Sequence, residues 1–384
     1  MRITGVETVL YEYELSRPIG DVNIPGGIRR RADLAVFVRT DEGIDGVAAA
    51  SRLGAGAIPM LSGAVIGEDP LGHRGLWERM IGASFKPGNE GATAIGIAAI
   101  DNALWDLRAK IAGVPLWKFL GALEPRVLAY ASGLDGPLGD AELRSYYESM
   151  AAQGVRAGKL KVGFGVDTDL RRLAIMHEAL GGSAVGPTLL VDANEFWSPK
   201  QAVRAMRALE GEFDIAWCEE PVIRTDLDGL RDVSRAINAA VATGENLKDI
   251  RLFAALLRHG SADVVQVNPN MAGLTTCLRA AELAQAFDRP VSLMNSAGRY
   301  GAHLAAALPH HTMMEVLDAG RDATFTFDST ITEGWIVLGE GPGAGITFDP
   351  EALERHRVDH PDALNARLAA GRHPRAGVRE HPDE

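Results

Sequence analysis

Residues 188–194 read TLLVDAN, and this stretch decides the fold. A short run of apolar strand formers ends at Asp192, and a helical pattern follows at 198–209. The same order returns at 215–221, which read IAWCEEP. Short apolar strands that alternate with helices are typical of βαβ units, whose strands run parallel. The two stretches therefore predict a parallel α/β architecture.

Six more strand-like runs extend this pattern in both directions. They lie at 127–132, 157–162, 241–245, 263–268, 291–295 and 313–317. Eight such strands within about 190 residues favour a parallel barrel that closes on itself. The alternative is an open doubly wound sheet, which usually carries a three-glycine fingerprint after its first strand. Gly163 and Gly165 lack the third glycine, so the signal for the open sheet is weak.

The chain on either side of these strands has a different order of elements. Residues 1–125 place strand-like segments first and helical ones, including 92–112, afterwards, which indicates a small α+β domain. Residues 325–384 return to strand-like and turn-rich sequence, and we expect the tail after about 358 to be loosely held. The barrel is accordingly predicted over 126–324.

The composition limits the classes of function. The 384 residues carry a formal net charge of −12, with 46% apolar and 23% charged residues, as in a globular protein. An acidic chain disfavours nucleic acid as a partner, because that binding needs clustered cations. No apolar leader and no run of 18 apolar residues occurs, so we expect a cytoplasmic protein with no membrane partner. Two cysteines, Cys218 and Cys277, are too few for a disulfide framework.

Three acids end successive strands of the expected barrel: Asp192, Glu219 and Glu245. The carboxyl ends of the strands meet at one face, so these side chains should converge. Three carboxylates would repel one another unless a cation neutralises them, and an all-oxygen ligand set suits Mg²⁺. The alternative is that each acid pairs separately with an arginine or a lysine.

Two lysines, Lys159 and Lys161, lie on the same side of the strand at 157–162, since side chains alternate along a strand. Two close ammonium groups lower each other's pKa, which would make a neutral lysine available as a base. The alternative is a pair of solvated lysines, which a place beside the expected metal site disfavours.

An ordered set of motifs resembles the enolase superfamily, and most closely its mandelate racemase-like members. The motifs read GKLKVG at 158–163, VDAN at 191–194, EEP at 219–221 and ATGEN at 242–246. AAIDNALWD at 98–106 and PGAG at 342–345 extend the resemblance over nearly the whole chain. It implies a (β/α)7β modified TIM barrel with an α+β N-terminal capping domain that the C-terminal segment completes.

The resemblance also implies a chemistry. Asp192, Glu219 and Glu245 would hold one Mg²⁺, and the substrate would be a small carboxylate bound to it. Lys161 would remove the proton α to that carboxylate, giving a metal-stabilised enediolate. Lys159 would lower the pKa of Lys161 and stabilise the intermediate. We also expect a homo-oligomer.

The chain departs from the racemase pattern on its sixth and seventh strands. Relatives have an Asp that orients a His there, whereas this chain has Asn268 and Asn295, and Glu315 takes the position of the eighth-strand acid. Neither Asn exchanges a proton at neutral pH, so a two-base racemase is disfavoured. We therefore expect a hydro-lyase of carbohydrate acid catabolism. It would remove water from a sugar acid or a related α-hydroxy acid and yield a 2-keto acid.

Several residues remain candidates for proton donation and for specificity. Lys161, Lys159 and Tyr300 could each protonate the leaving group. Arg299 could bind a distal carboxylate, and segments 19–31, with three arginines, and 52–57 could select the substrate. Hydrogen bonds to sugar hydroxyls could come from polar side chains near the strand ends, namely Asn194, Asn268, Asn295 and Ser132. We expect His303, His310 and His311 to have packing or surface roles.

Two other functions stay open. The first is another one-base reaction on the same scaffold, by an epimerase, racemase or cycloisomerase of a carboxylate. The second is a barrel that only binds a ligand, which Asn268 and Asn295 suggest. The retained lysines and the three acids count against it, because a binding protein needs no such set.

Overall fold

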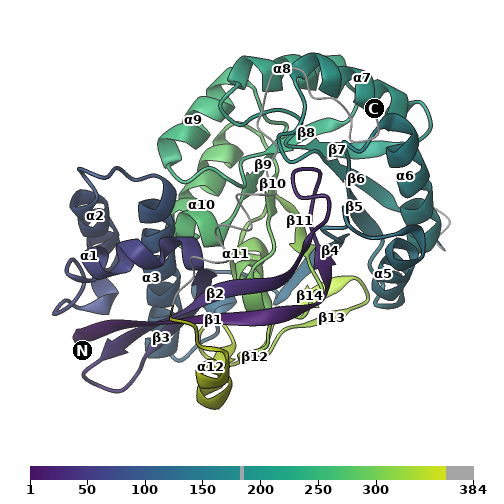
Figure 1. Ribbon diagram of the computed structural model, residues 1–384. Helices are drawn as coiled ribbons and strands as arrows, with labels where there is room; N and C mark the ends of the chain where they lie inside the picture. The colour runs from purple at the N-terminus through teal and green to yellow at the C-terminus, as the bar shows by residue number, and fades with distance from the viewer. Residues whose placement is uncertain (182–185, 360–384) are drawn as a thin grey trace.

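The computed structural model describes residues 1–181 and 186–359, and a closed eight-stranded barrel forms the larger part of the molecule (Figure 1). Its strands run in chain order and parallel to their neighbours, and β11 pairs with β4 to close the sheet. They are β4 (Arg126–Ser132), β5 (Ala157–Lys161), β6 (Thr188–Asp192), β7 (Ile215–Glu219), β8 (Ala240–Thr243), β9 (Val264–Val267), β10 (Val291–Leu293) and β11 (His311–Val316). The predicted closed barrel is confirmed, and the open sheet is wrong.

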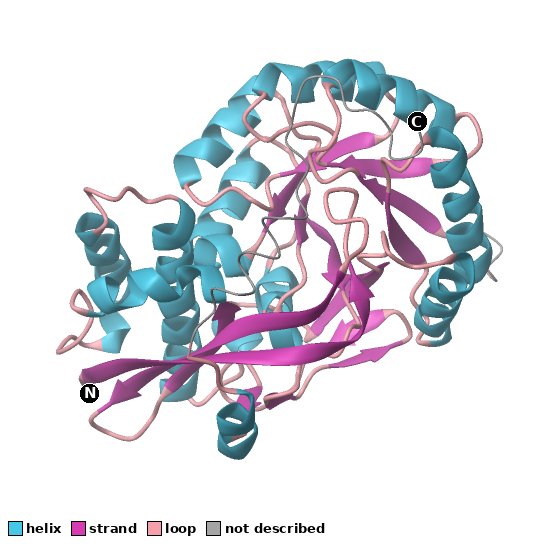
Figure 2. Ribbon diagram, in the orientation of Figure 1, coloured by secondary structure: helices cyan, strands magenta, loops and turns pink. Residues whose placement is uncertain are grey.

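A ring of helices covers the outside of the barrel (Figure 2). They are α5 (Asp140–Ala152), α6 (Val166–Leu180), α7 (Pro199–Glu210), α8 (Leu227–Ala236), α9 (Ile250–His259), α10 (Pro269–Ala286) and α11 (Gly301–Ala307). Their apolar faces pack inward: α9, for example, buries Phe253, Leu256 and Leu257 at helical spacing. Inside the barrel, Tyr130, Leu190 and Trp217 belong to one buried cluster that fills the space below the site.

The sequence pattern predicts a helix over 274–287, and α10 begins five residues earlier, at Pro269. Asn268 caps it by accepting the Asn270 N–H at 3.0 Å, and Pro269 occupies the first turn. At Gly273 the backbone has φ +78°, and a Cβ there would lie 2.7 Å from Asp101 Oδ2. The sequence pattern therefore identified only the part of the helix beyond this kink.

The N-terminal unit is a three-stranded antiparallel sheet with helices on one side. Its strands are β1 (Ile3–Ile19), β2 (Ile28–Thr40) and β3 (Gly46–Ser51), followed by η1 (Arg52–Ala57), α1 (Ile58–Ser62), η2 (Pro70–Gly72), α2 (His73–Ala83), α3 (Gly91–Ile111) and α4 (Leu116–Phe119). Helix α3 packs on β3 on one side and on α10 of the barrel on the other. The sequence pattern predicts strands over 2–13 and 32–40, whereas β1 and β2 pair with each other as far as Ile19 and Ile28.

The C-terminal segment returns to both units. It contains β12 (Phe325–Phe327), β13 (Thr330–Thr332), β14 (Trp335–Val337), β15 (Ile346–Phe348) and α12 (Pro350–His356). Strand β14 pairs antiparallel with β4 of the barrel, and the Phe348 ring packs on Phe37 of the N-terminal sheet at 5.4 Å. The tail that we expected to be loosely held lies, from residue 360 onward, outside the described residues.

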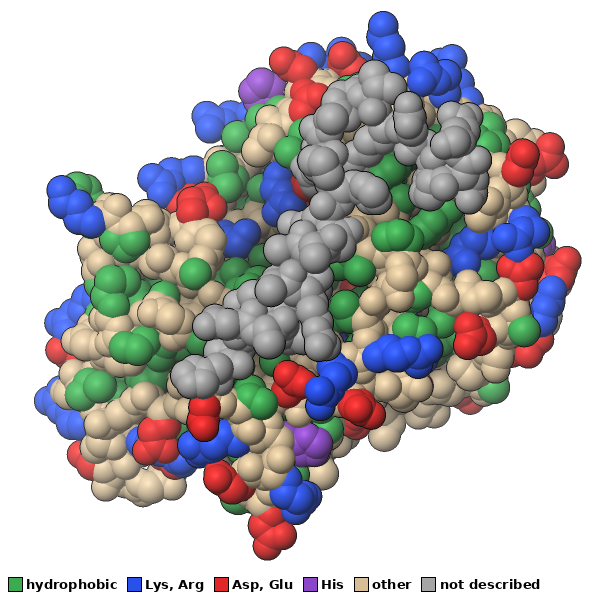
Figure 3. Space-filling view, viewed as in Figure 1, with side chains coloured by type: hydrophobic (Ala, Val, Ile, Leu, Met, Phe, Trp, Pro, Cys, Tyr) green, Lys and Arg blue, Asp and Glu red, His purple; other side chains and the backbone are tan. Residues whose placement is uncertain are grey.

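Charged side chains of both signs are interspersed over the face drawn in Figure 3. The described part of this face has no continuous basic area of the kind that nucleic acids bind. None of the helices in the described part of the chain is long and apolar enough to cross a membrane.

Candidate active site

Lysines and acids from neighbouring strands meet inside the carboxyl end of the barrel. The Lys159 Nζ lies 3.3 Å from Asp192 Oδ2 and 3.0 Å from Glu315 Oε1, and it also contacts Glu219. Lys161 contacts Asp192 through its own Nζ. All five side chains are at most 3% exposed. The barrel therefore brings together residues that lie as far apart in the chain as 159 and 315.

Glu245 approaches the same end of the barrel from the turn after β8 (Ala240–Thr243). Gly244 makes this turn with φ +124°, and a Cβ on it would lie 2.6 Å from the Gln266 carbonyl oxygen. Asn246 donates hydrogen bonds to Glu245 Oε1 at 3.0 Å and to Glu220 Oε1 at 2.9 Å. Burial raises the pKa of Glu245 well above its ordinary value, and the charge of Glu220 raises it further.

The donor set suits a divalent cation. Burial and then the charge of Asp192 raise the pKa of Glu219 well above its ordinary value, so negative charge is crowded here. Carboxylate oxygens are the ligands that Mg²⁺ prefers. Asp192 and Glu219 offer them from fully buried strand ends, and Glu245 offers them from the half-buried turn after β8. Within residues 1–181 and 186–359 no three acidic, histidine or cysteine side chains are arranged closely enough to hold one metal ion. The ammonium of Lys159 lies between Asp192 and Glu219 instead.

The pKa values of the two lysines correct one expectation. Burial would lower the pKa of Lys161, but Asp192 raises it above its ordinary value. Burial would likewise lower the pKa of Lys159. The charges of Glu219 and Glu315 outweigh burial and raise this pKa well above its ordinary value. Lys159 does lower the pKa of Lys161, as the sequence predicts, but Asp192 outweighs this effect, because carboxylates outnumber ammonium groups in the same buried space.

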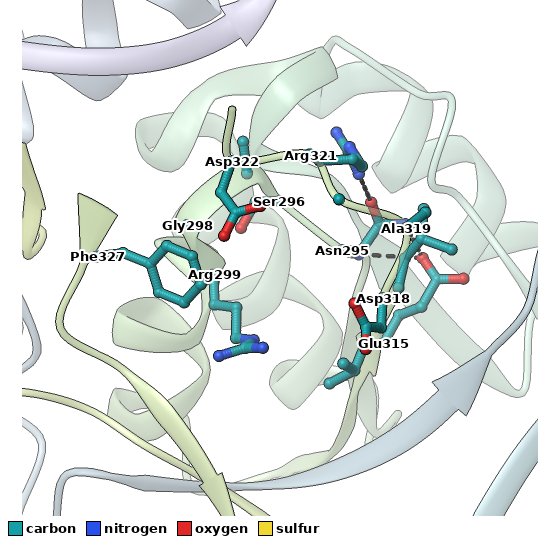
Figure 4. A pocket seen from close by; sticks show the side chains of 14 residues that line it. Asn295, Ser296, Gly298, Arg299, Glu315, Asp318, Ala319, Arg321, Asp322 and Phe327 are labelled. Carbon is teal, nitrogen blue, oxygen red and sulfur yellow. Dashed lines mark hydrogen bonds between the residues drawn. The ribbon is translucent and has the colours of Figure 1, made fainter. Parts of the chain in front are cut away.

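Glu315 and Asn295 lie beside each other at the ends of β11 and β10 (Figure 4). The Asn295 backbone N–H donates to Glu315 Oε2 at 3.1 Å, and the Asn295 amide contacts the same oxygen. Burial opposes ionisation of Glu315, but Lys159 and Lys161 lower its pKa to about 2. Arg321, which the sequence analysis did not select, contacts the Asn295 Oδ1 from the loop after β11.

Gln266, and not Asn268, supplies the polar side chain of β9. Gln266 is fully buried, and its Nε2 donates to Glu219 Oε2 at 2.5 Å. The side chain of Asn268 is engaged in capping α10. The alternation of β9 could have identified Gln266, because Val264 and Gln266 share the inward face whereas the strand ends before position 268.

Tyr300 does not meet the lysines. Its buried hydroxyl donates to Asn270 Oδ1 at 2.7 Å and accepts from Asn102 Nδ2 at 2.8 Å, between α10 and α3. As a proton donor to the substrate, Tyr300 is thus poorly placed, because both of its hydrogen-bonding partners belong to the contact between the domains.

The remaining candidates lie around the same end of the barrel. Arg299 lines the pocket beside Asn295 (Figure 4), and its Nη1 donates to the Ser329 carbonyl at 3.2 Å. Ser132 is fully buried and lies next to Lys159 in the register of β4 and β5. Asn194 has φ +43°, and its backbone N–H donates to Asp192 Oδ1 at 2.8 Å. Asn194 thus fixes the orientation of an acid of the cluster.

The turn at 20–27, between β1 and β2, covers part of the barrel mouth. Asn23 Nδ2 donates to the Asn194 carbonyl at 3.0 Å, and Gly20 N–H donates to the Leu134 carbonyl at 2.8 Å. A Cβ on Gly163 would lie 3.2 Å from Val22 Cγ2, so this turn packs closely on the loop after β5. Part of the expected selectivity segment 19–31 therefore does reach the site.

Other expected specificity residues are engaged within the N-terminal unit. Arg30 pairs with Glu12 at 3.1 Å, and Arg31 pairs with Asp33 at 3.1 Å. Segment 52–57 forms η1, which packs mainly on α3. An anion would therefore have to compete with internal carboxylates for two of the three arginines.

Two family models match the chain. The model described as enolase C-terminal domain-like matches residues 142–352, and the mandelate racemase / muconate lactonizing enzyme N-terminal domain matches residues 21–121. The chain belongs to the enolase superfamily. Its N-terminal match places this enolase-superfamily chain in the mandelate racemase-like group, which confirms the resemblance drawn from the motifs.

Curated relatives of this enolase-superfamily chain catalyse several reactions. It is 35% identical over 302 residues to 3,6-anhydro-alpha-L-galactonate cycloisomerase of Streptomyces coelicolor, which covers 78% of this chain and 82% of that protein. It is 30% identical over 366 residues to L-talarate/galactarate dehydratase of Salmonella typhimurium, covering 91% and 90%. Hydrophobic dipeptide epimerase of Enterococcus faecalis is 29% identical over 311 residues, covering 76% and 81%.

Solved structures agree on the architecture. A racemase from Streptomyces coelicolor A3(2), crystallised with bound magnesium, has a TM-score of 0.85 at 32% identity and covers 93% of this chain and 100% of its own. L-talarate/galactarate dehydratase from Salmonella typhimurium LT2, liganded with Mg and L-lyxarohydroxamate, has a TM-score of 0.83 at 27% identity and covers 93% of both chains. The modified TIM barrel with its capping domain is thereby confirmed.

Proposed function

We propose that this chain is a magnesium-dependent lyase that removes water from a sugar acid or a related α-hydroxy acid and yields a 2-keto acid. The observation that carries the proposal is the asymmetry of the barrel mouth. Buried Lys161 lies at the end of β5, whereas the amides of Gln266 on β9 and of Asn295 just after β10 occupy the other side. One base faces groups that cannot exchange a proton, which favours a one-base elimination over two-base racemisation.

Asp192, Glu219 and Glu245 would hold the metal ion. Relatives crystallised with magnesium support the choice of metal, and the convergence of acids at the barrel mouth supports the choice of ligands. When bound, Mg²⁺ supplies positive charge that neutralises these carboxylates and stabilises negative charge on a substrate carboxylate. The neutralised carboxylates then no longer raise the pKa of Lys161.

The residues of the chain itself would move the proton. An uncharged Lys161 Nζ takes the proton from the carbon next to the substrate carboxylate, and the resulting carbanion forms a double bond as the β C–O bond breaks. The Lys161 ammonium then returns that proton to the departing oxygen, which leaves as water. Lys159, held by Glu315, keeps its charge near the reacting carboxylate. The enol that remains tautomerises to the 2-keto acid.

A second candidate is a cycloisomerase of an anhydro sugar acid. It is favoured by the 35% identity to the anhydrogalactonate cycloisomerase. The proton chemistry at Lys161 would be the same, but the departing oxygen would belong to a ring of the substrate and would stay in the product. Dehydration lowers the mass of the product by one water, whereas cycloisomerisation conserves the mass.

One experiment separates these reactions. Acid sugars and their anhydro forms are incubated with the protein and Mg²⁺ in deuterated water, and products are followed by mass spectrometry and NMR. After correction for deuterium taken up from the solvent, a 2-keto acid lighter by one water supports the dehydratase, and a 2-keto acid of the substrate's mass supports the cycloisomerase. Deuterium exchange or inversion at the α carbon without elimination would exclude both assignments and indicate an epimerase. The absence of both 2-keto acid formation and α-proton exchange with every acid tested would contradict the proposed function.

A further inference from the structure

Asn295 is held from two sides by groups of opposite hydrogen-bonding character. Its amide contacts Glu315 Oε2 on one side, and Arg321 Nη1 contacts its Oδ1 on the other (Figure 4). An ionised carboxylate only accepts hydrogen bonds, and a guanidinium only donates them. The Asn295 NH₂ group must therefore face Glu315, and its carbonyl must face Arg321.

Arg321 directs its charge at this amide, and no carboxylate of the described residues competes for it. It forms no ion pair within residues 1–181 and 186–359, and its one side-chain hydrogen bond there is the contact with Asn295. The chain of contacts continues from Asn295 to Glu315 and, at 3.0 Å, to the Lys159 Nζ. One arginine outside the cluster is thus connected to a lysine inside it.

The fixed amide has a consequence for the chemistry. The Asn295 carbonyl is occupied by Arg321, and one of its two N–H groups is occupied by Glu315. The second N–H makes no hydrogen bond to the described residues, so Asn295 keeps a donor for a ligand in the mouth of the barrel.

We propose that Arg321 is a positioning residue: by holding the Asn295 carbonyl, it makes Asn295 a hydrogen-bond donor to a substrate oxygen and keeps Glu315 directed at Lys159. The inference rests on the proposed function for its kinetic consequences, although the arrangement of Asn295 and Glu315 can be tested by itself. It accounts for how one side of the site can bind an oxygen-rich acid without supplying a second base.

The kinetic test is a double-mutant cycle with Arg321→Met and Asn295→Ala. Arg321→Met should lower kcat/KM about 10- to 100-fold, mainly through kcat, because a misplaced Glu315 and Asn295 no longer orient the reacting groups. Since Arg321 acts through Asn295, the double variant should be no slower than Asn295→Ala alone. Arg321→Lys should restore part of the rate, because an ammonium can still donate to the carbonyl.

The matched control is Arg144→Met, which removes an arginine that pairs with Glu178 on the surface and should leave the rate unchanged. Effects of Arg321→Met and Asn295→Ala that multiply in the double variant would overturn the proposal, because Arg321 would then act independently of Asn295.

A structural arm works even if no substrate is found. In a crystal structure of the Arg321→Met protein with Mg²⁺, the Asn295 side chain should leave Glu315 or adopt more than one rotamer. An Asn295 side chain that keeps its contact with Glu315 would overturn the inference. Absence of turnover in the wild-type protein, by contrast, would overturn only the proposed reaction.

Discussion

At the residue scale, the chemistry depends on the pKa of Lys161, on which burial and neighbouring charge have opposite effects. Burial favours the neutral amine that a base requires, while Asp192 favours the ammonium, and in this structure Asp192 prevails. The same carboxylate is a proposed metal ligand, so the charge state of Lys161 should depend on whether Asp192 is engaged elsewhere.

Lys161→Ala should abolish the reaction while preserving the fold. Removal of a general base costs about 10²- to 10⁴-fold in rate. Lys159 remains 3.3 Å from Asp192, so the acid would keep a buried cation after the substitution. Deuterium exchange at the α carbon measures the loss, and circular dichroism checks the fold. Lys200→Ala, at an exposed position on α7, is the control. Exchange near the wild-type rate in Lys161→Ala would exclude Lys161 as the base.

At the element scale, the β1–β2 hairpin connects the capping unit to the barrel. Its two strands run far beyond the sheet formed with β3, and the turn at 20–27 ends on loops after β4, β5 and β6. Position 163 favours glycine for two reasons: its φ is +105°, and a Cβ on it would lie 3.2 Å from Val22 Cγ2. The hairpin is therefore positioned to exclude water from bound substrate.

Asn23→Ala should raise KM by about 2- to 10-fold, which corresponds to the loss of one hydrogen bond of roughly 0.5–1.5 kcal/mol. The substitution removes the contact with the Asn194 carbonyl, so the closed turn is populated less. Steady-state kinetics with the substrate from the screen measure this effect. Thr8→Ala, exposed on the distant part of β1, should have no effect. An unchanged KM in Asn23→Ala would mean that the turn is not part of the binding site.

At the scale of the whole molecule, His303 connects the barrel to segments on both sides of it. Its Nδ1 accepts the Trp117 backbone N–H at 3.0 Å, and its Nε2 lies 3.2 Å from the Ala344 carbonyl. Burial lowers the pKa of His303 to about 4. The expected packing role of this histidine thus has a specific form, because protonation of Nδ1 would break the bond to Trp117.

Stability should accordingly fall in acid. The pKa of His303 is lower in the folded state than the ordinary 6.5, so its contribution is present above pH 6.5 and is lost as the pH falls through about 4. The difference amounts to roughly 3 kcal/mol. Urea unfolding at pH 7.5 and at pH 4.5 should show a smaller pH dependence in His303→Gln than in the wild type. His259→Gln, at an exposed position, should behave like the wild type. Equal pH dependence in all three proteins would contradict the role assigned to His303.

Mg²⁺ should stabilise the whole protein, because a ligand that binds the folded state adds about 2.7 kcal/mol at a hundred times its Kd. The melting temperature should rise with Mg²⁺ and fall again with EDTA. Glu245→Gln should weaken this response, whereas Glu178→Gln on the surface should preserve it. A Glu245→Gln protein with the full response would remove Glu245 from the ligand set.

The sequence alone determined the barrel, its eight strands and the convergence of lysines and acids. These follow from local patterns, since polar residues lie at or just beyond the ends of the apolar strands and parallel strands present their carboxyl ends at one face. Only the tertiary structure decided what each side chain contacts. Gln266, and not Asn268, faces the site, because β9 ends before position 268. The Tyr300 hydroxyl accepts a hydrogen bond from Asn102 of a distant helix and does not meet the lysines. The charge state of the lysines was likewise decided by folding, because it depends on how many carboxylates share their buried space.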